Sequence, residues 1–203
     1  MIKSKQSYKY NYTINPNSSN TCSTIYLVRH AQPNSHALNG HLTNLGIIQA
    51  KKIAEHLSKI PELSDKNLNE SQRPLIIVSP TARTRETADF ICQKLNIRPI
   101  IHSAFAEEYL VDTNKNFISP AFLRNHVRVK RLMHSFNKIV NSARGRPIIV
   151  VSHGNIIRMI LGKIQSMSYN QISKIEVSCA SIIRIITLNN KLQRMEYTLQ
   201  TDF

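Results

Sequence analysis

Residues 24–30 read Thr-Ile-Tyr-Leu-Val-Arg-His, a short apolar run that ends in two basic side chains. An unbroken apolar run of this length is typical of a strand that is buried on both faces of a sheet. Residues 74–78 and 147–151 repeat the pattern. Residues 98–101 predict a shorter strand, and Pro99 places it at a strand start or at a sheet edge. The chain therefore carries several strands of the kind found in covered, parallel sheets.

Stretches with helical spacing of apolar residues separate these strands. The four predicted helices run from Thr43 to Leu57, from Thr81 to Leu95, from Ser119-Pro120 to Gly145, and from Asn155 to Gly162. Thr43 is a residue type that caps helix N-termini, and Pro61 is expected to stop the first pattern after Leu57. In the second helix, the residues expected to face inward are Ala82, Ala88, Ile91, Cys92 and Leu95. Residues 180–188 and 192–199 predict two strands joined as a hairpin at Asn189-Asn190. This alternation predicts an α/β fold: a three-layer α/β/α sandwich with a mostly parallel central sheet, helices on both faces and an antiparallel end.

Length and composition exclude several classes of protein. The 203 residues are 41% hydrophobic, enough for one domain with a real core. Residues 1–22 are polar and lack apolar periodicity, so they predict a flexible tail before a single domain over residues 23–203. The three cysteines are widely spaced, and no apolar run reaches membrane-spanning length. The start of the chain lacks an apolar signal segment, which predicts a cytoplasmic protein with no integral membrane association and leaves secretion without a cleaved signal open.

The charge balance is strongly basic and unevenly distributed. Lys and Arg number 27 against 12 Asp and Glu, a formal net charge of +15, and no acidic residue occurs from Thr113 to Ile175. Such a field attracts phosphorylated substrates, nucleic acid or acidic membrane surfaces, whereas the simplest alternative is a solvated face that keeps the protein soluble. Aromatic residues near this stretch are few, which argues against nucleic acid.

Basic and imidazole side chains follow three of the predicted strands. The first strand ends in Arg29-His30, the second leads through Ser79 to Arg83, and the fourth ends in Ser152-His153. The carboxyl ends of parallel strands form the ligand crevice of an open α/β sheet, and a helix start adds N–H groups that suit an oxyanion. Each histidine alone could be an ordinary buried residue, but three strand ends of this kind predict an anion site.

Two other chemistries fit the same residues less well. Neighbouring arginines repel a cation, and no carboxylate lies near His30 or His153 in the sequence, so a metal site is not expected. Ser79 and Ser152 lack the Gly-x-Ser-x-Gly context of a nucleophilic serine.

Four stretches resemble the histidine phosphatase superfamily, the phosphoglycerate mutase-like group with the Arg-His-Gly signature. They are Leu-Val-Arg-His-Ala-Gln at 27–32, Leu-Thr-x-x-Gly-x-x-Gln-Ala at 42–50, Ser-Pro-x-x-Arg-x-x-x-Thr-Ala at 79–88 and Val-Ser-His-Gly-x-Ile-x-Arg at 151–158. The resemblance covers roughly residues 24–190, with the four motifs in the family's order.

The resemblance implies a phosphohistidine mechanism that needs no metal or cofactor. His30 would be the catalytic nucleophile, and the phosphate would be bound by Arg29, Arg83 and His153 together with Asn34, His36 and Gly154. The general acid would be Glu107, with Glu108 as the substitute candidate. The expected activity is hydrolysis of a phosphomonoester. The expected partner is a phosphorylated small molecule or a phosphoprotein, and the oligomeric state stays open.

Several positions depart from the family pattern. Ala31 replaces the usual Gly, His36 stands where many members carry Asn, and His41 stands where an acidic residue often precedes Leu-Thr. The chain has no Trp, so the Gly-x-Trp-x-Gly element is missing, which argues against a glycolytic mutase. The basic stretch from Lys115 to Arg146 lies where members usually build a substrate lid. A mutase-type phosphotransferase and a non-catalytic phosphate- or phosphoprotein-binding module remain the alternatives.

Overall fold

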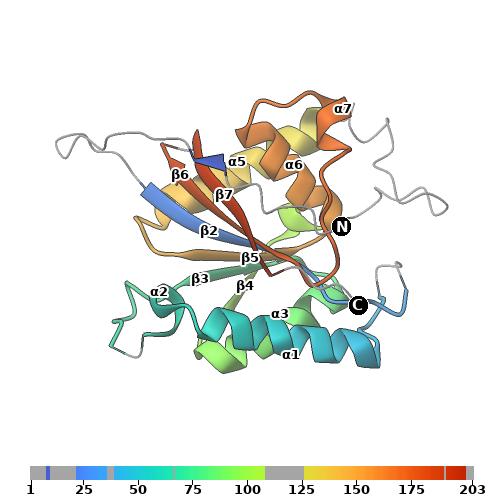
Figure 1. Cartoon of the computed structure of the whole chain (residues 1–203), viewed down its shortest axis with the longest axis vertical. Coiled ribbons are helices and arrows are strands. Elements are labelled where there is room, and N and C mark those ends of the chain that lie inside the picture. Colours follow the sequence, from blue (N-terminus) through green and yellow to red (C-terminus); the bar gives the residue numbers. More distant parts are fainter. Residues whose placement is uncertain are drawn as a thin grey trace.

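A computed structural model of the chain describes residues 8–9, 22–35, 39–65, 67–107, 126–189 and 191–199 (Figure 1). The strands are β1 (Tyr8–Lys9), β2 (Cys22–Arg29), β3 (Leu75–Val78), β4 (Pro99–Ile101), β5 (Ile148–Ser152), β6 (Ile182–Leu188) and β7 (Lys191–Leu199). The helices are α1 (Asn44–Ser58), α2 (Pro61–Ser64), α3 (Ala82–Leu95), the 3₁₀ turn η1 (Ser103–Phe105), α5 (His126–Ser142), α6 (Gly154–Ile164) and α7 (Tyr169–Ile172). Within these residues, no helix has the length and apolar character needed to cross a membrane.

One seven-stranded sheet runs through the molecule in the order β1-β7-β6-β2-β5-β3-β4. The pairs β2–β5, β5–β3 and β3–β4 are parallel, whereas β2–β6, β6–β7 and β7–β1 are antiparallel. The predicted parallel sheet with an antiparallel end is confirmed. Because β2, β5 and β3 are parallel neighbours, their carboxyl ends meet at one edge, where the sequence places its basic residues.

Helices cover both faces of the sheet, as predicted. Figure 1 shows α1 and α3 on one side and α5, α6 and α7 on the other. Successive residues of β2 serve the two sides: Ile25 and Leu27 pack into the core with α5 and α6, and Tyr26 and Val28 pack into the core with α1 and α3. All four are at most 1% exposed, and each such burial contributes on the order of 2 kcal/mol. An unbroken apolar run is what a strand covered on both faces requires.

The predicted helix boundaries hold where capping chemistry is plain. Thr43 caps α1, and its hydroxyl accepts a hydrogen bond from the Gly46 N–H. Pro61 does not merely stop the pattern, because it occupies the first turn of the short helix α2, where its missing N–H is not needed. Pro99 begins β4, which forms an edge of the sheet. The four-residue helix α7 was not predicted.

Several sequence-based expectations reach beyond the described residues. The start of the third long helix at Ser119-Pro120 lies outside them, and α5 is described from His126. Of residues 1–22, Tyr8–Lys9 form β1, which pairs with Met195 and Arg194 of β7, and Cys22 begins β2. The division into a tail and one domain stays a prediction.

Candidate active site

The ends of β2 and β5 lie side by side at one edge of the sheet. Arg29 is in register with Ser152, and the N–H of His30 donates to the Ser152 carbonyl at 3.0 Å. The N–H of Ser79, just after β3, donates to the Val151 carbonyl at 3.1 Å. The parallel ladder thus brings together three segments that are far apart in the sequence.

His30 is held in a defined orientation at this edge. Its ring is 1% exposed, and Nδ1 lies 2.8 Å from the Ala31 carbonyl oxygen. Because a carbonyl can only accept, Nδ1 carries the proton in the neutral ring and Nε2 keeps its lone pair. Burial, followed by the charges of His153, Arg29 and Arg83, keeps the pKa of His30 well below its ordinary value, although the Ala31 bond opposes the shift. The ring is therefore neutral near pH 7.

Arg83 lies at the centre of the cluster. It is on the first turn of α3 and is only 2% exposed. Its Nε donates to Nε2 of His30 at 3.3 Å, and its Nη2 lies 3.2 Å from Nδ1 of His153 and 3.6 Å from Oε2 of Glu107. Burial lowers the pKa of Arg83, and the nearby Glu107 carboxylate opposes that shift. The guanidinium stays charged, because even a lowered arginine pKa lies far above neutrality.

His153 bridges a hydroxyl and a carboxylate. Its Nε2 lies 2.8 Å from Ser79 Oγ, and its Nδ1 lies 3.3 Å from Oε2 of Glu107. Arg83 Nη2 lies 3.2 Å from the same Nδ1, so this atom has a donor and an acceptor beside it. With a proton, Nδ1 donates to the Glu107 carboxylate and Nε2 accepts from the Ser79 hydroxyl; without one, Nδ1 accepts from Arg83 and Nε2 donates to the Ser79 hydroxyl. Burial lowers the pKa of His153, which Glu107 partly offsets. The centroids of the His30 and His153 rings are 5.2 Å apart.

Glu107 reaches the cluster from the segment after η1. The Ser152 hydroxyl donates to the Phe105 carbonyl at 2.8 Å, which ties this segment to the end of β5. Burial raises the pKa of Glu107, but the hydrogen bond and charge of His153 and the charges of Arg83 and Arg29 outweigh it and lower the pKa. The carboxylate is therefore ionised near neutral pH.

Arg29 closes another side of the cluster. Its Nη1 donates to the Val177 carbonyl at 2.5 Å, and its Nε is buried without a hydrogen-bond partner among the described residues. A Cβ on Gly154, the first residue of α6, would lie 3.4 Å from this guanidinium. Arg29 thus lies against the N-terminus of α6, where N–H groups also favour an anion.

The sequence model of the histidine phosphatase superfamily (branch 1) matches residues 25–116 and 126–198. The chain belongs to the histidine phosphatase superfamily. No protein with a curated description matches the sequence with significance.

Solved structures extend the likeness to three dimensions. A mycobacterial glucosyl-3-phosphoglycerate phosphatase is 16% identical, with a TM-score of 0.65, over 88% of this chain and 100% of that chain. A variant of the phosphoserine phosphatase of Entamoeba histolytica, in complex with phosphoserine, is 16% identical, with a TM-score of 0.65, over 87% of this chain and 96% of that chain. At these identities the likeness establishes that the chain has the superfamily fold.

Of the remaining residues that the superfamily resemblance assigns, Asn34 is described, and no hydrogen bond or ion pair among the described residues joins it to the cluster. Asn34 is exposed in a turn, where its N–H donates to the His41 carbonyl at 2.8 Å. His36, Glu108 and the stretch from Lys115 to residue 125 lie outside the described residues. Of the predicted set, Arg29, His30, Arg83, Glu107, His153 and Gly154 are brought together.

His41, which stands where members of the superfamily often carry an acidic residue, meets a carboxylate from elsewhere. Its Nδ1 pairs with Glu86 of α3, whose other oxygen accepts from the Leu42 N–H at 2.8 Å. The carboxylate thus comes from α3 and ties the loop before α1 to that helix.

Sequence reasoning missed the buried hydroxyls that support the cluster. Of the residues expected to face inward, Ala88 and Ile91 are fully buried, Cys92 and Leu95 are half-buried and pack against the same core, and Ala82 is half-buried. Also buried are Thr84, which donates to the Ser79 and Thr81 carbonyls, and Thr87, which accepts from the Ala31 N–H and donates to the Arg83 carbonyl. The available signal was Thr at positions 84 and 87 of a helix whose Arg83 was already assigned to the site.

The cluster also contains a possible set of metal ligands. Ligand atoms of His30, Glu107 and His153 lie within 4.8 Å of one another, so the fold supplies a carboxylate that is remote in the sequence. These residues could hold a cation such as zinc in principle. The Arg83 guanidinium, however, contacts all three of them, and a fixed positive charge there favours an anion.

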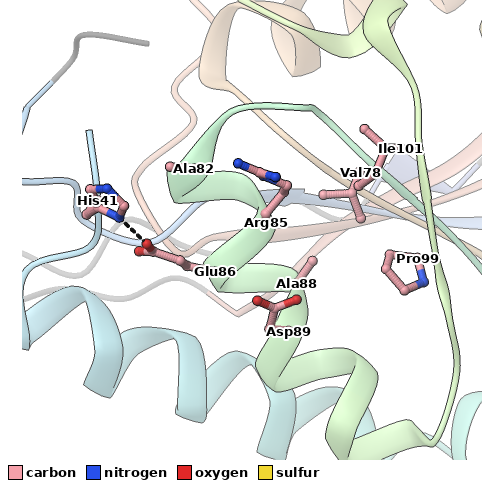
Figure 2. A pocket seen from close by; sticks show the side chains of 9 residues that line it. All are labelled: His41, Val78, Ala82, Arg85, Glu86, Ala88, Asp89, Pro99 and Ile101. Carbon is pink, nitrogen blue, oxygen red and sulfur yellow. Dashed lines mark hydrogen bonds and ion pairs between the residues drawn. The ribbon is translucent and has the colours of Figure 1, made fainter. Parts of the chain in front are cut away.

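A separate pocket lies between α3 and the strands β3 and β4. Figure 2 shows that side chains of α3, β3 and β4 line it, with His41 at one end. Its volume is about 300 Å³, and its lining residues are Val78, Pro99 and Ile101 from the strands, Ala82, Arg85, Glu86, Ala88 and Asp89 from α3, and His41. It shares no residue with the cluster around His30, so it is not the candidate catalytic centre.

Proposed function

We propose that the protein is a metal-independent phosphatase that hydrolyses a phosphomonoester through a phosphohistidine intermediate on His30. The observation that carries the proposal is the state of His30: a neutral ring whose Nδ1 proton is bound to Ala31 and whose Nε2 lone pair faces Arg83. An unprotonated ring nitrogen beside fixed positive charge is suited to attack a phosphorus atom that carries anionic oxygens.

Arg29, Arg83 and His153 would bind the phosphoryl group during transfer. The two guanidiniums supply paired, planar donors, and the buried Arg29 Nε is a donor for which a phosphate oxygen is a fitting partner. Gly154 is the first residue of α6, so the backbone N–H groups at this helix N-terminus would also bind the phosphoryl oxygens. Arginine charge does here what a metal ion does in other phosphatases.

The reaction would have two steps. First, the hydrogen bond from Arg83 Nε to Nε2 of His30 breaks, the freed Nε2 lone pair forms a P–N bond while the ester P–O bond breaks, and the leaving oxygen takes a proton. Second, water attacks the phosphohistidine, the P–N bond breaks, and inorganic phosphate leaves with His30 restored.

Glu107 is the residue we assign to proton transfer. Its lowered pKa leaves it ionised in the free site, so the proton would arrive with the substrate as a phosphate monoanion. Phosphate charge beside Glu107 opposes ionisation and favours the protonated carboxyl, which then donates to the leaving oxygen. In the second step the carboxylate would accept a proton from the attacking water.

The substrate class is a phosphorylated small molecule or a phosphoprotein. The first test is hydrolysis of an aryl phosphate in the presence of EDTA by the native protein and by His30→Ala, with Arg146→Gln, remote from the cluster, as the matched control. We expect activity in the native and control proteins and none in His30→Ala, together with trapping of radiolabelled phosphate on His30. Full activity in folded His30→Ala, or loss of activity in EDTA, would contradict the proposal. Transfer of the label to product would indicate a mutase, and phosphate binding without turnover a binding module.

A further inference from the structure

Three consecutive backbone carbonyls, those of residues 175–177, each accept a hydrogen bond from a different side chain. Arg158 Nε donates to the Ile175 oxygen at 2.6 Å, the Tyr197 hydroxyl donates to the Glu176 oxygen at 2.9 Å, and Arg29 Nη1 donates to the Val177 oxygen at 2.5 Å. The donors come from α6, β7 and β2, whereas the acceptors lie in a segment without regular secondary structure. The segment is therefore fixed by side chains in place of a backbone ladder.

The same segment continues directly beneath the candidate nucleophile. Ala180 is fully buried with φ of 59°, a left-handed conformation that an alanine seldom adopts. In that conformation its N–H donates to the His30 carbonyl at 3.1 Å. The Arg29 N–H donates to the Ser181 carbonyl at 3.1 Å. The segment thus contacts Arg29 at both its backbone and its side chain.

Arg158 is fixed between α6 and the segment of residues 175–177. It lies one turn into α6, is only partly exposed, and uses two edges of its guanidinium: Nε on Ile175 and Nη1 on the Asn155 side-chain oxygen at 3.0 Å. Burial, followed by the charge of Arg29, lowers its pKa, so the two cations are close enough to repel each other. Two like charges held near one another need fixed acceptors, and the carbonyls of Ile175 and Val177 provide one for each.

We infer that Arg158 is a positioning residue for Arg29: by fixing the Ile175 carbonyl, it sets where the Val177 carbonyl lies and hence where the Arg29 guanidinium meets the phosphoryl group. Tyr197 supports the same segment from β7 through the carbonyl between them. This inference rests on the proposed function, because it requires Arg29 to bind the transferred phosphate.

The variants separate position from charge. Arg158→Gln removes both the positive charge and the two guanidinium donors. Arg158→Lys keeps the charge, but its ammonium cannot hold the same two acceptors in a fixed geometry. Tyr197→Phe removes only the hydroxyl that binds the Glu176 carbonyl. Arg146→Gln is the matched control, because Arg146 Nε likewise donates to a backbone carbonyl, that of Arg73, at 2.8 Å and away from the cluster. Each variant is made in the native and the Arg29→Ala background, with thermal unfolding recorded to verify the fold.

The readouts are the dissociation constant of inorganic phosphate and kcat/KM for an aryl phosphate. We expect Arg158→Gln and Arg158→Lys each to raise the dissociation constant of phosphate and to lower kcat/KM by about tenfold, because a displaced Arg29 guanidinium loses alignment with the phosphoryl oxygens. Tyr197→Phe should have a smaller effect on both. In the Arg29→Ala background these losses should disappear.

Other outcomes overturn the inference in distinct ways. If Arg158→Lys has the native dissociation constant and kcat/KM, Arg158 contributes its positive charge and does not position Arg29. Equal losses with and without Arg29 would make it a structural residue, as would losses matched by Arg146→Gln. If Arg29→Ala itself leaves phosphate affinity and turnover unchanged, the proposed role of Arg29 fails, and the inference about Arg158 fails with it.

Discussion

The hydroxyl of Ser79 lies 2.8 Å from Nε2 of His153, although the two residues are 74 positions apart in the chain. Ser79 follows β3 and His153 follows β5, and these strands are parallel neighbours. The hydroxyl occupies one ring nitrogen of His153, so the other is directed at Glu107 and Arg83. The Thr81 hydroxyl lies farther from the same Nε2, at 3.5 Å, so Ser79 is the nearer of the two buried hydroxyls that orient the second histidine.

Replacing Ser79 by Ala should impair both stability and turnover. The buried His153 Nε2 would lose its nearest hydrogen-bond partner and keep only the Thr81 hydroxyl at 3.5 Å, which costs roughly 1–3 kcal/mol of unfolding free energy. Loss of the fixed ring orientation should lower kcat/KM for an aryl phosphate by about tenfold. Ser142→Ala is the control, since Ser142 is exposed at the end of α5. Denaturant unfolding and steady-state kinetics check the prediction, and a native kcat/KM in Ser79→Ala would contradict it.

The buried neutral His30 should make the protein sensitive to acid. Its pKa is lowered in the folded state, so below the ordinary value of 6.5 the unfolded chain binds a proton that the folded chain does not. Unfolding free energy is then lost as the pH falls, by up to about 1.4 kcal/mol per pH unit for each such histidine. His30→Gln should flatten this slope between pH 6.5 and more acidic conditions, whereas Ser142→Ala, at an exposed position without a titratable group, should not. Equal slopes in the two variants would refute the assignment.

Glu107→Gln should slow hydrolysis in a way that depends on the leaving group. A poor leaving group, such as an alkyl alcohol, needs a proton, and general acid catalysis contributes on the order of 10²–10⁴-fold. A nitrophenolate needs little help, so its hydrolysis should fall far less. Glu108→Gln is the comparison, because the sequence leaves the choice between the two carboxylates open. The opposite ranking of the two variants would transfer the role to Glu108.

Gly46→Ala should loosen the loop that follows the candidate nucleophile. A Cβ at Gly46 would lie 2.2 Å from the Gln32 carbonyl oxygen, a backbone atom that cannot turn aside. The start of α1 would have to shift, at a cost on the order of 1–3 kcal/mol in unfolding free energy. Ile48→Ala on the same helix, at a site 51% exposed, should cost much less. Similar unfolding midpoints for the two variants would rule out this contact as a constraint.

The helix layer formed by α5, α6 and α7 should make substrate capture sensitive to salt. No Asp or Glu occurs in residues 126–175, while Lys130, Arg131 and Lys138 are exposed along α5. For a substrate with several negative charges, KM should rise with ionic strength, because screening weakens attraction between exposed charges. Lys138→Gln should reduce that dependence, and Lys59→Gln, on the opposite layer beside Glu55, should not. A KM that is independent of salt would show that this layer does not steer the substrate.

Much of the fold could be predicted because its strands are covered on both faces. Residues 24–28, 74–78 and 147–151 are continuous apolar runs, and each coincides with a strand of the parallel half. Thr43 marked the start of α1 because a capping hydroxyl acts locally. The helix α7 was not predicted because a helix of four residues shows no hydrophobic periodicity, although Ser168 and Gln171 form a capping box at its start.

The candidate site was predictable where side chains follow strands directly. Arg29, His30 and His153 stand at strand ends, and parallel pairing makes those ends meet. Glu107 came only from the resemblance to the superfamily, because nothing near it in the sequence indicates that Ser152 holds its segment through Phe105. The carbonyls of residues 175–177 could not be foreseen either, since side-chain bonds to backbone oxygens depend on tertiary packing and leave no periodic trace.

The central place of β2 in the sheet bears on how the protein is made. β2 leaves the ribosome before both of its neighbours in the sheet, β5 and β6, which pair with it through residues 148–152 and 182–188. Closing so long a loop costs entropy and slows folding, so we expect the β2–β5 pair to form late. A nascent chain that stops before residue 182 has β2 without its neighbour β6, and one that stops before residue 177 also lacks the two backbone carbonyls, of residues 177 and 181, that accept hydrogen bonds from Arg29. Phosphatase activity in a translation mixture should therefore emerge only once the final hairpin is synthesised, which makes enzymatic turnover a direct reporter of completed folding.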